Sequence, residues 1–423
     1  MLQKPKGTYD IYGADAQRVL YLKKLINVLM EKYNYNYIQS PTFESSEVFH
    51  RGVGETTDIV SKETYDFKDR GERSLTLRPE GTAGIVRSFI ENKLYTSSMP
   101  VKLWYYGSMF RYERPQAGRN REFSQYGVEV FGSESPMVDA EVISILVTLF
   151  RMLGLKGIKV NINSLGDSQS RMRYRDALVD YFKPYLDELC DDCKNRYSKN
   201  PLRMLDCKVD QDKEFMKSAP KISDYLTEES KKHFELVQKY LTAMDIDYVV
   251  DNNLVRGLDY YTHTVFEVEA DIKGFGSQNV LGAGGRYNNL VELMEGPSTP
   301  GVGFAIGIER LLLALEAEDI DICEKNLVDI YVMNLSEDEN EYMVNLVNYL
   351  RLNGYCVEMD YQGRNIKNNF KHADKISARF VIIVGPDEIK KDLITIKNNE
   401  TKEEFKVKFD ELLEFLDEKI SED

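Results

Sequence analysis

The chain has few of the residues that disulfide-bonded and membrane proteins depend on: it contains only five cysteines among 423 residues. A small and odd number of cysteines argues against a disulfide framework and for the reducing cytosol. A run of about 18 apolar residues, which a membrane-spanning helix needs, is missing. The first residues, MLQKPKGTYD, lack the apolar core of a signal peptide. We therefore expect a cytoplasmic protein that does not cross a membrane.

An excess of positive charge is also missing, because 55 Lys and Arg residues stand against 70 Asp and Glu residues, a net charge of -15. The balance does not suggest a nucleic-acid-binding protein, yet such binding depends on local basic patches and not on net charge. The length is too great for one ordinary hydrophobic core. We expect two or three domains with the composition of a globular protein.

The hydrophobic pattern separates strand-rich segments from a helical one. Residues 14–33 repeat their apolar residues with a helical period, and residues 101–132 indicate two strands that flank a polar loop. Residues 168–245 are charged and mostly helical in pattern, which favours an inserted helical module. Strand pattern then returns, and residues 301–316 predict a buried strand that runs into a helix.

The last part of the chain alternates strands and helices after a polar linker at 317–326. The pattern predicts strands at 328–333, 355–360, 379–385 and 392–398, and helices at 337–353, 364–378 and 403–417. This order is typical of a small α/β domain of roughly 95 residues. The predicted division is 1–167 and 246–322 as two parts of a core, 168–245 as an insertion, and 327–423 as a C-terminal domain.

The segment FRYERPQAGRNREFSQYGVEVFG (110–132) gathers four arginines before an apolar strand. Successive side chains of a strand point to opposite faces. One face of this strand carries Ser124, Tyr126, Val128 and Val130, and the other carries Phe123, Gln125, Gly127, Glu129 and Phe131. The first face suits a core. The second is either a solvated hairpin face or the floor of a ligand site, and its interleaved phenylalanines favour the ligand site.

If the two strands pair as a long hairpin, Arg111 of the first strand lies over the same surface as Gln125 and Glu129. These residue types fit a nucleotide and a polar substrate. The guanidinium of Arg111 offers paired donors to a phosphate and stays charged. Phe123 is suited to stack on a planar base. Gln125 and Glu129 suit a cationic or hydrogen-bonding substrate. The loop arginines fit either a triphosphate or a nucleic-acid backbone; they are Arg114, Arg119 and Arg121.

Two further segments carry polar residues where strands meet helices or loops. In LTLRPEGTAGIVRSFIE (75–91), Glu80 stands at a strand-to-helix junction, where a carboxylate also serves an ordinary helix entry. In LVRGLDYYTHTVFEVEA (254–270), an arginine and two tyrosines precede a strand whose predicted partner is rich in glycine. Glycines let a backbone approach a ligand closely, which indicates a pocket.

Arg310 lies in the first turn of the predicted helix that follows the strand in GVGFAIGIERLLLALE. A cation is unfavourable at a helix N-terminus, so Arg310 requires an anionic partner. A carboxylate in a surface salt bridge and a nucleotide phosphate are the two alternatives.

These segments resemble the motifs of a known family. The segment 110–132 closely resembles motif 2 of class II aminoacyl-tRNA synthetases in its histidyl form, GVGFAIGIERLL resembles motif 3, and helix 14–33 with IQSPTFE resembles motif 1. RGLDYYTHTVFE and GAGGRYNNLVE look like the two histidine-specific motifs of histidyl-tRNA synthetases. The resemblance covers essentially the whole chain.

The resemblance implies a fold and an activity. The fold is an α/β multidomain architecture with an antiparallel-sheet class II catalytic core, a helical insertion and a C-terminal α/β anticodon-binding domain. The activity is ATP-dependent activation of L-histidine to histidyl-adenylate, followed by transfer to the 3′ end of histidine tRNA. ATP is used with Mg²⁺, and the chain is expected to form a homodimer through the motif 1 region.

The resemblance also implies residue roles. The histidine site would comprise Glu80, Gly81, Thr82, Arg111, Gln125, Glu129, Arg256, Tyr260 and Tyr261. The ATP site would comprise Arg111, Glu113, Arg119, Arg121, Phe123 and Arg310, with Arg256 and Arg111 catalytic. Arg114 and Gln116 would meet the acceptor end of the tRNA. The chain has Asn288 where the family pattern usually has Asp, and His263 at a position expected to vary; neither touches a proposed catalytic contact.

Two other functions remain open at this point. One is a non-catalytic regulatory paralogue that senses histidine and binds a biosynthetic enzyme, and the other is an RNA-binding accessory subunit without catalysis. Such paralogues usually lack the C-terminal domain and lose the motif arginines. This sequence has the domain, and Arg111, Arg256 and Arg310 are intact.

The segment CDDCKNRYSKNPLRMLDC contains Cys190, Cys193 and Cys207. Cys-x-x-Cys resembles half of a zinc site. Because one further cysteine follows nearby and His233 is distant, the ligand count is short. We predict no metal bound by protein side chains, and leave zinc at these cysteines open.

The helix expected at 364–378 carries a basic stripe of Arg364, Lys367, Lys371 and Lys375. The stripe beside it, predicted to be buried, consists of Ile366, Phe370 and Ala373. A basic stripe is either a solvated face or a surface for RNA, and the resemblance favours RNA.

Overall fold

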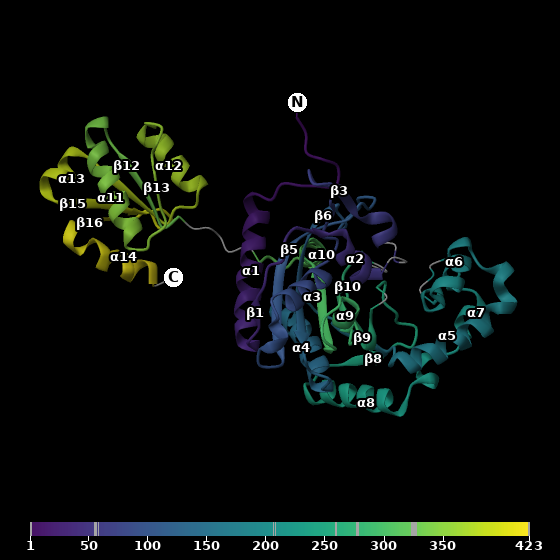
Figure 1. Cartoon of the computed structure of the whole chain (residues 1–423). Helices are drawn as coiled ribbons and strands as arrows, with labels where there is room; N and C mark the ends of the chain where they lie inside the picture. The colour runs from purple at the N-terminus through teal and green to yellow at the C-terminus, as the bar shows by residue number, and fades with distance from the viewer. Residues whose placement is uncertain are drawn as a thin grey trace. The chain divides into compact units, whose positions relative to one another are not determined.

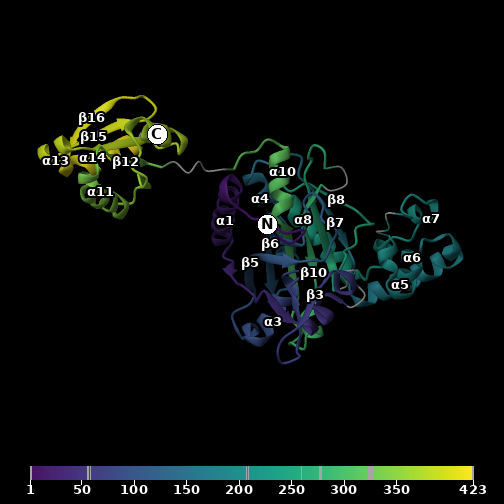
Figure 2. The same ribbon diagram turned by 90° about the horizontal axis from the view of Figure 1, so that it is seen from above.

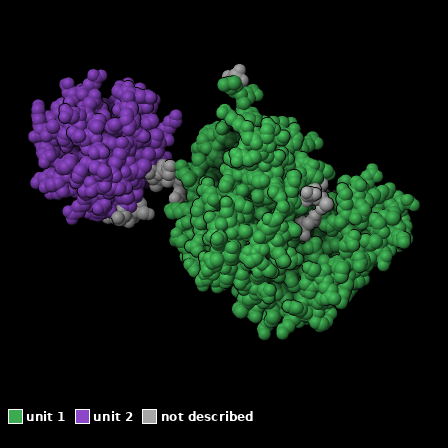
Figure 3. Space-filling model, in the orientation of Figure 1, with its two compact units in different colours: residues 1–322 green, residues 323–423 purple. Residues whose placement is uncertain are grey.

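The structure is a computed structural model that describes residues 2–421 apart from 55, 56, 58, 206, 208, 259, 276–278 and 323–327. Asp259 of the RGLDYY segment and residues 323–326 of the expected linker thus lie outside the described residues. The chain forms two compact units, residues 1–322 and 323–423 (Figures 1 and 3). Among the described residues, none of the helices has the length and apolarity needed to span a membrane.

The first unit is built on an eight-stranded sheet with the strand order β1-β5-β6-β11-β10-β9-β7-β8. Its strands are β1 (Asn36–Tyr37), β5 (Val101–Phe110), β6 (Glu122–Phe131), β7 (Lys159–Ser164), β8 (Tyr248–Val250), β9 (Thr262–Glu269), β10 (Val280–Arg286) and β11 (Gly301–Gly307). The two edge strands, β1 and β8, pair in parallel with their neighbours. All other pairs are antiparallel, which confirms the expected antiparallel core.

One face of this sheet packs against helices through the main hydrophobic core. The helices are α1 (Gly13–Tyr33), α4 (Pro136–Met152), α8 (Glu228–Ala243) and α10 (Ile308–Ala317). Figure 2 shows α4, α8 and α10 on one side of the sheet and α3 with β3 on the other. The start of α4 is set by its sequence, because the Ser135 hydroxyl accepts a hydrogen bond from the Met137 amide and Pro136 needs no partner there.

The opposite face is covered by shorter elements. They are α2 (Ser46–Phe49), α3 (Thr82–Glu91), α9 (Leu290–Leu293) and a three-stranded sheet of β2 (Phe43–Ser45), β4 (Ser74–Leu77) and β3 (Tyr65–Lys68). A second apolar cluster joins α3 to β5 through Phe89, Leu103 and Tyr105. This face leaves room for cavities over the centre of the sheet.

Residues 168–245 contain α5 (Ser168–Phe182), α6 (Asp191–Lys199), α7 (Glu214–Lys217) and α8, with short 3-10 turns between them. The segment up to residue 226 has a small apolar cluster of its own, which includes Tyr174, Phe182 and Met204. Helix α8 instead buries Phe234 and Val237 in the main core. The separation of 168–245 from the core as an insertion stays a prediction.

The second unit is a five-stranded sheet with the order β13-β12-β14-β15-β16. Its strands are β12 (Ile330–Asn334), β13 (Val357–Met359), β14 (Phe380–Val384), β15 (Leu393–Asn398) and β16 (Glu404–Lys408). Its helices are α11 (Asn340–Leu352), α12 (Ile366–Lys375), α13 (Pro386–Lys391) and α14 (Leu412–Ser421). Strands and helices alternate as expected up to β14.

Two expectations for this unit were wrong. The helix predicted at 403–417 is strand β16 followed by α14, because Phe405 and Val407 alternate along an edge strand that pairs with β15. Ile366, placed in the buried stripe of α12, is exposed. Asn369 is buried instead, since it accepts a hydrogen bond from the Tyr331 hydroxyl at 2.6 Å.

Candidate functional site

Two adjoining cavities lie on the face of the large sheet opposite the main core. The larger has a volume of about 690 Å³ and the smaller about 200 Å³. Both are lined by Arg111, Gln125 and Arg256, so a ligand in one cavity contacts the same side chains as a ligand in the other. The pair therefore suits two reactants that must meet.

Strand β6 supplies the floor of the smaller cavity, as its alternation predicts. Tyr126, Val128 and Val130 belong to the main core on the helix side. Gln125 and Glu129 line the smaller cavity on the other side. The two-residue period of the strand thus explains why an amide and a carboxylate interrupt an apolar run.

Glu80 and Thr82 reach the smaller cavity from the start of α3. The Glu80 carboxylate accepts hydrogen bonds from the amides of Thr82 at 2.7 Å and Ala83 at 2.8 Å, so it does serve the helix entry. Burial raises the pKa of Glu80, although these amide bonds and Arg111 oppose the rise. The Thr82 hydroxyl donates to Glu129 at 2.7 Å and ties the helix start to the sheet.

Glu129 is the most deeply buried carboxylate of this cavity, with 1% of its surface exposed. Burial raises its pKa to about 8, even though hydrogen bonds from the hydroxyls of Tyr287 and Thr82 favour the charged form. On the adjacent strand β11, a Cβ at Gly303 would clash with the Glu129 carboxylate. The sequence at both positions therefore makes room for a buried acid that is poised to pair with a cation.

Tyr260 and Tyr261 close another side of the smaller cavity, and their ring centroids lie 4.6 Å apart. Gly81 lies beside the cavity without lining it. A Cβ at Gly81 would clash with the ring of Tyr105, so this glycine makes room for an aromatic side chain of β5.

Three guanidinium groups from distant segments converge on the larger cavity. Arg111 follows β5, Arg256 precedes β9, and Arg310 lies in the first turn of α10. The Nε atom of Arg111 donates to the Pro79 carbonyl at 2.8 Å, and the Arg256 guanidinium forms an ion pair with Glu267. The convergence matches the expectation from the sequence.

Arg310 has the least compensated charge of the three. Its Nη1 atom donates to the Val280 carbonyl at 3.2 Å, and within the described part of the chain no carboxylate lies within 4 Å of it. Burial lowers the pKa of Arg310, and the neighbouring Arg119 adds to that effect. An anionic ligand in the cavity would restore the balance.

Two polar atoms at the boundary of the cavities are buried without a hydrogen-bond partner among the described residues. They are Oε1 of Gln125 and Nε of Arg256. A buried polar atom that lacks a partner costs roughly 1–3 kcal/mol, so such atoms are usually satisfied by something that binds. They indicate a polar ligand at the place where the two cavities meet.

The residues predicted on the β5–β6 loop and at the start of β6 divide between the cavity and the surface. Glu113, Gln116, Arg119 and Phe123 line the larger cavity. Arg121 turns away, with its guanidinium 4.0 Å from the ring centroid of Tyr112. Arg114 is exposed outside the cavity. The structure therefore brings together four of these six residues.

Among the contributors that the sequence analysis missed are Tyr287, Glu309 and Arg203. Tyr287 pairs with Glu129, and its signal was the aromatic residue that ends the glycine-rich strand segment GAGGRY. Glu309 accepts a hydrogen bond from the Ser124 amide at 2.7 Å beside Arg310. Arg203 lines the larger cavity from the helical segment at 168–245, and no local sequence pattern predicts this position.

Arg286, in contrast, lies away from both cavities. It is fully buried and forms an ion pair with Asp139, while its Nη1 atom donates to Asn288 at 3.3 Å. The Asn288 departure from the family pattern therefore concerns a structural ion pair and not the ligand site.

Comparisons with known proteins agree with this geometry. The family model described as "Histidyl-tRNA synthetase" matches residues 7–311, and the model "Anticodon binding domain" matches residues 329–419. The chain is 50% identical over 421 residues to a histidine–tRNA ligase of Oceanobacillus iheyensis, covering 99% of this chain and 98% of the relative. It is 53% identical to a histidine–tRNA ligase of Anoxybacillus flavithermus, covering 96% of each chain.

A solved structure gives the same result. The crystal structure of apo histidyl-tRNA synthetase from S. aureus superposes with a TM-score of 0.85 at 43% identity. The match covers 98% of this chain and 100% of that one. Similarity therefore extends over both compact units.

Proposed function

Because the chain belongs to the histidyl-tRNA synthetase family, we propose that its smaller cavity binds L-histidine and its larger cavity binds ATP. The reaction is ATP-dependent activation of histidine to histidyl-adenylate and transfer of the histidyl group to the 3′ end of histidine tRNA. The observation that carries the assignment is the convergence of Arg111, Arg256 and Arg310 beside the buried Glu129.

The smaller cavity fits histidine by size and polarity. The carboxylates of Glu80 and Glu129 suit the α-amino group and an imidazole N–H, and Gln125 offers an acceptor without a partner. Tyr260 and Tyr261 offer flat surfaces to a small ring. A wrong amino acid would leave these buried polar groups unpaired, at a cost on the order of 10⁴-fold in specificity. Selection of histidine thus needs no separate editing site.

The larger cavity fits ATP. Phe123 stacks on adenine, Arg119 and Arg310 hold the β- and γ-phosphates, and Arg111 holds the α-phosphate. Arg121 and Gly81 do not contact the nucleotide in this assignment. Arg121 packs on Tyr112 and so stabilises the β5–β6 loop, and Gly81 leaves space for the Tyr105 ring of β5. These roles place one arginine near each phosphate of the nucleotide.

Mg²⁺ accompanies ATP in this assignment, and Glu113 is the residue that fits it. Its carboxylate lines the larger cavity, and its ion pairs with described residues are long, at 4.0 Å with Arg111 and 3.7 Å with Arg119. Mg²⁺ in nucleotide sites takes one or two carboxylates and keeps several waters. When bound, the ion neutralises phosphate charge.

The chemistry follows from positioning and charge. A carboxylate oxygen of histidine attacks the α-phosphorus of ATP, and the bond to the bridging oxygen breaks as pyrophosphate leaves with the electron pair. Arg256 and Arg111 stabilise the charge that grows on the α-phosphate oxygens. The terminal hydroxyl of the tRNA then attacks the adenylate carbonyl and releases AMP. Arg114 and Gln116, on the β5–β6 loop, meet the acceptor end of the tRNA.

Histidine-dependent exchange of pyrophosphate into ATP tests the first step. We expect exchange with histidine alone among the amino acids, and a fall of about 10³-fold or more for Arg256→Ala. Arg73→Ala serves as the matched control, since Arg73 lies outside both cavities and pairs with Asp69 on the surface. Undiminished exchange in Arg256→Ala, or exchange without any amino acid, would overturn the assignment.

The second unit is an anticodon-binding domain, and we propose that α12 contributes to the surface that contacts the anticodon. Lys367, Lys371 and Lys375 are exposed on this helix, whereas Arg364 is engaged by Asp360. Replacing the three lysines with Ala should weaken tRNA charging and leave pyrophosphate exchange unchanged. Lys390→Ala with Lys391→Ala, on the exposed face of α13, is the control. Equal losses in charging and exchange would contradict the RNA-contact role.

We further propose that the protein is a cytoplasmic homodimer whose chains meet at the motif 1 region. Helix α1 exposes Leu20 and Val28, and the edge strand β1 exposes Tyr37. Apolar residues at a sheet edge and on a neighbouring helix suit an interface. Light scattering should give twice the mass of one chain, and Leu20→Glu should reduce it to a monomer.

A further inference from the structure

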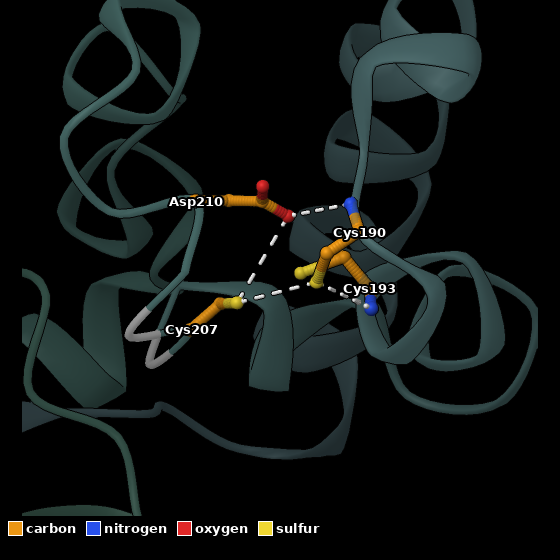
Figure 4. Close-up of side chains that lie close together, drawn as sticks. All are labelled: Cys190, Cys193, Cys207 and Asp210. Atoms are coloured by element: carbon orange, nitrogen blue, oxygen red, sulfur yellow. Dashed lines mark hydrogen bonds between the residues drawn. The ribbon is translucent and has the colours of Figure 1, made fainter.

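The helical segment at 168–245 contains a cluster of potential metal ligands that plays no part in the reaction described above. It consists of Cys190, Cys193, Cys207 and Asp210, whose side chains point toward one another (Figure 4). One ligand atom from each of the four lies within 4.8 Å of every other. We propose that these four residues bind one zinc ion as a structural site.

The sequence spacing supports the assignment. Two residues separate Cys190 from Cys193, and two separate Cys207 from Asp210. Two such pairs, joined by a longer segment, form the arrangement of many structural zinc sites. The count of cysteines and histidines alone fell one ligand short, because the fourth ligand is a carboxylate. Asp is an accepted zinc ligand.

Two of the distances between ligand atoms are close to those of a tetrahedron around zinc, and no pair is farther apart than 4.8 Å. The sulfur atoms of Cys190 and Cys207 lie 3.6 Å apart, and the Cys207 sulfur lies 3.9 Å from Oδ2 of Asp210. Tetrahedral zinc with Zn–S bonds of about 2.3 Å and Zn–O bonds of about 2.0 Å places its ligand atoms roughly 3.5–3.8 Å apart. The four side chains need move little to surround an ion.

The surroundings are built to hold deprotonated ligands. The Cys193 amide donates to the Cys190 sulfur at 3.4 Å, and the Cys190 amide donates to Oδ2 of Asp210 at 3.0 Å. Three thiolates and a carboxylate would leave a net charge of about −2 around a divalent ion. The Lys213 ammonium, 2.8 Å from Oδ1 of Asp210, offsets part of that charge. These contacts orient ligands from outside, as is usual around protein-bound metals.

The segment that contains the four residues also has little hydrophobic core to stabilise it, and a bound metal would add stability. Between Lys183 and Leu226 the chain forms short 3-10 turns and the helices α6 and α7, of nine and four residues, around one small apolar cluster. Cores of this size are commonly completed by a structural metal or a disulfide. Soft thiolate ligands in a closed tetrahedral set favour zinc over harder divalent ions.

The site has a consequence for the larger cavity that rests on the proposed function. Residues Pro201–Met204 lie in the loop closed by the two ligand pairs, and Arg203 of this turn lines the larger cavity. Leu202 and Met204 pack in the same apolar cluster as Cys193 and Cys207. A metal that ties the ends of this loop together thus also fixes the turn that presents Arg203.

Metal analysis of the purified full-length protein tests the proposal without reference to activity. One equivalent of Zn²⁺ is added and unbound metal is removed. We then expect about one zinc ion per chain, measured by mass spectrometry of metals. Cys193→Ser and Asp210→Asn should bind zinc at least about tenfold more weakly. Cys356→Ser and Asp212→Asn, which change exposed residues, should bind zinc like the wild type.

Each other outcome overturns the site. These outcomes are a protein that stays free of zinc, ligand variants that bind like the controls, iron or copper held in preference to zinc, and a disulfide between Cys190 and Cys207. If a ligand variant fails to fold, the absorption spectrum of the metal-free wild type after addition of Co²⁺ tests the site instead. The absorption spectrum of tetrahedral, thiolate-bound cobalt is expected, and an octahedral spectrum contradicts the proposal. Loss of zinc with intact pyrophosphate exchange would uphold the metal site and reject only its link to Arg203.

Discussion

The two faces of strand β6 are both largely buried but have opposite characters. On the helix side, Tyr126 and Val128 have no exposed surface and sit in an apolar core. On the cavity side, Glu129 is 1% exposed and Gln125 is 9% exposed, yet both are polar. Degree of burial therefore does not distinguish the core from the site on this strand.

What distinguishes the core from the site is whether the buried polar groups have hydrogen-bond partners. The hydroxyl of Tyr126 donates to the Met30 sulfur at 3.1 Å, so this polar group of the core side has its partner within the core. On the cavity side, Oε1 of Gln125 has no partner among the described residues, and the Glu129 carboxyl is held in an environment that disfavours its charge. A folded protein tolerates such costs where a ligand later offsets them. This difference in hydrogen bonding supports the proposal that the polar face binds a substrate.

The largest expected effect comes from removing the charge of the polar face. Glu129→Gln keeps a side chain of the same shape that still bonds Thr82 and Tyr287, but it has no carboxylate. We expect kcat/KM for histidine in pyrophosphate exchange to fall on the order of 10³-fold, because a buried charge pair with the substrate is lost. Tyr126→Phe on the opposite face is the control and should change this value less than about twofold.

The second prediction reverses the comparison by cutting into the apolar face. Val128→Ala removes two methyl groups from the main core and should lower the free energy of unfolding by roughly 2 kcal/mol, measured by urea titration. Exchange activity per folded molecule should not change. A tenfold loss of activity at unchanged stability would show that the two faces are not separate in function.

The alternation on β6 was predictable from the sequence because a strand has a fixed period of two. Helix α1 was predictable for the equivalent reason, since its apolar residues repeat with the helical period, and it spans Gly13–Tyr33 against the predicted 14–33. The helix predicted at 403–417 failed where two signals competed. Its Glu, Lys and Leu content favours a helix, but the partner strand β15 stabilises Phe405 and Val407 in a hairpin.

The candidate site was predictable only in part, for a physical reason. Arg111, Arg256 and Arg310 stand in local patterns that indicate their chemistry before any contact is known. The packing of Arg121 on Tyr112 is a tertiary contact without a local pattern of its own. Cys207 and Asp210 do have the spacing of a ligand pair, but only the fold brings them next to Cys190 and Cys193. A sequence indicates which residue types are available, whereas the fold decides which of them meet.

A third prediction asks whether the polar face works alone. Arg203 reaches the larger cavity from outside the sheet, so Arg203→Ala should raise KM for ATP by about tenfold and leave KM for histidine unchanged. Arg196→Ala, whose guanidinium holds the Arg203 carbonyl at 3.0 Å, should have a smaller effect of the same kind. An unchanged KM for ATP in Arg203→Ala would show that Arg203 does not contact the nucleotide and that the nucleotide site consists of the sheet and its loops.

The smallest effect concerns the stability of the polar face and its dependence on pH. In the unfolded chain the Glu129 carboxyl titrates near its ordinary pKa of 4.5, whereas burial raises its pKa to about 8 in the folded protein. Between these values the folded state binds a proton that the unfolded state has lost, so this group's contribution to stability declines as pH rises from 4.5 to 8. Glutamine at this position cannot titrate. The melting temperature of ligand-free Glu129→Gln should therefore exceed that of the wild type by an amount that grows from pH 5 to pH 8, reaching roughly 3 °C. A constant difference across this range would show that the pKa of the Glu129 carboxyl is not raised in the folded protein, and that the polar face carries no such strain.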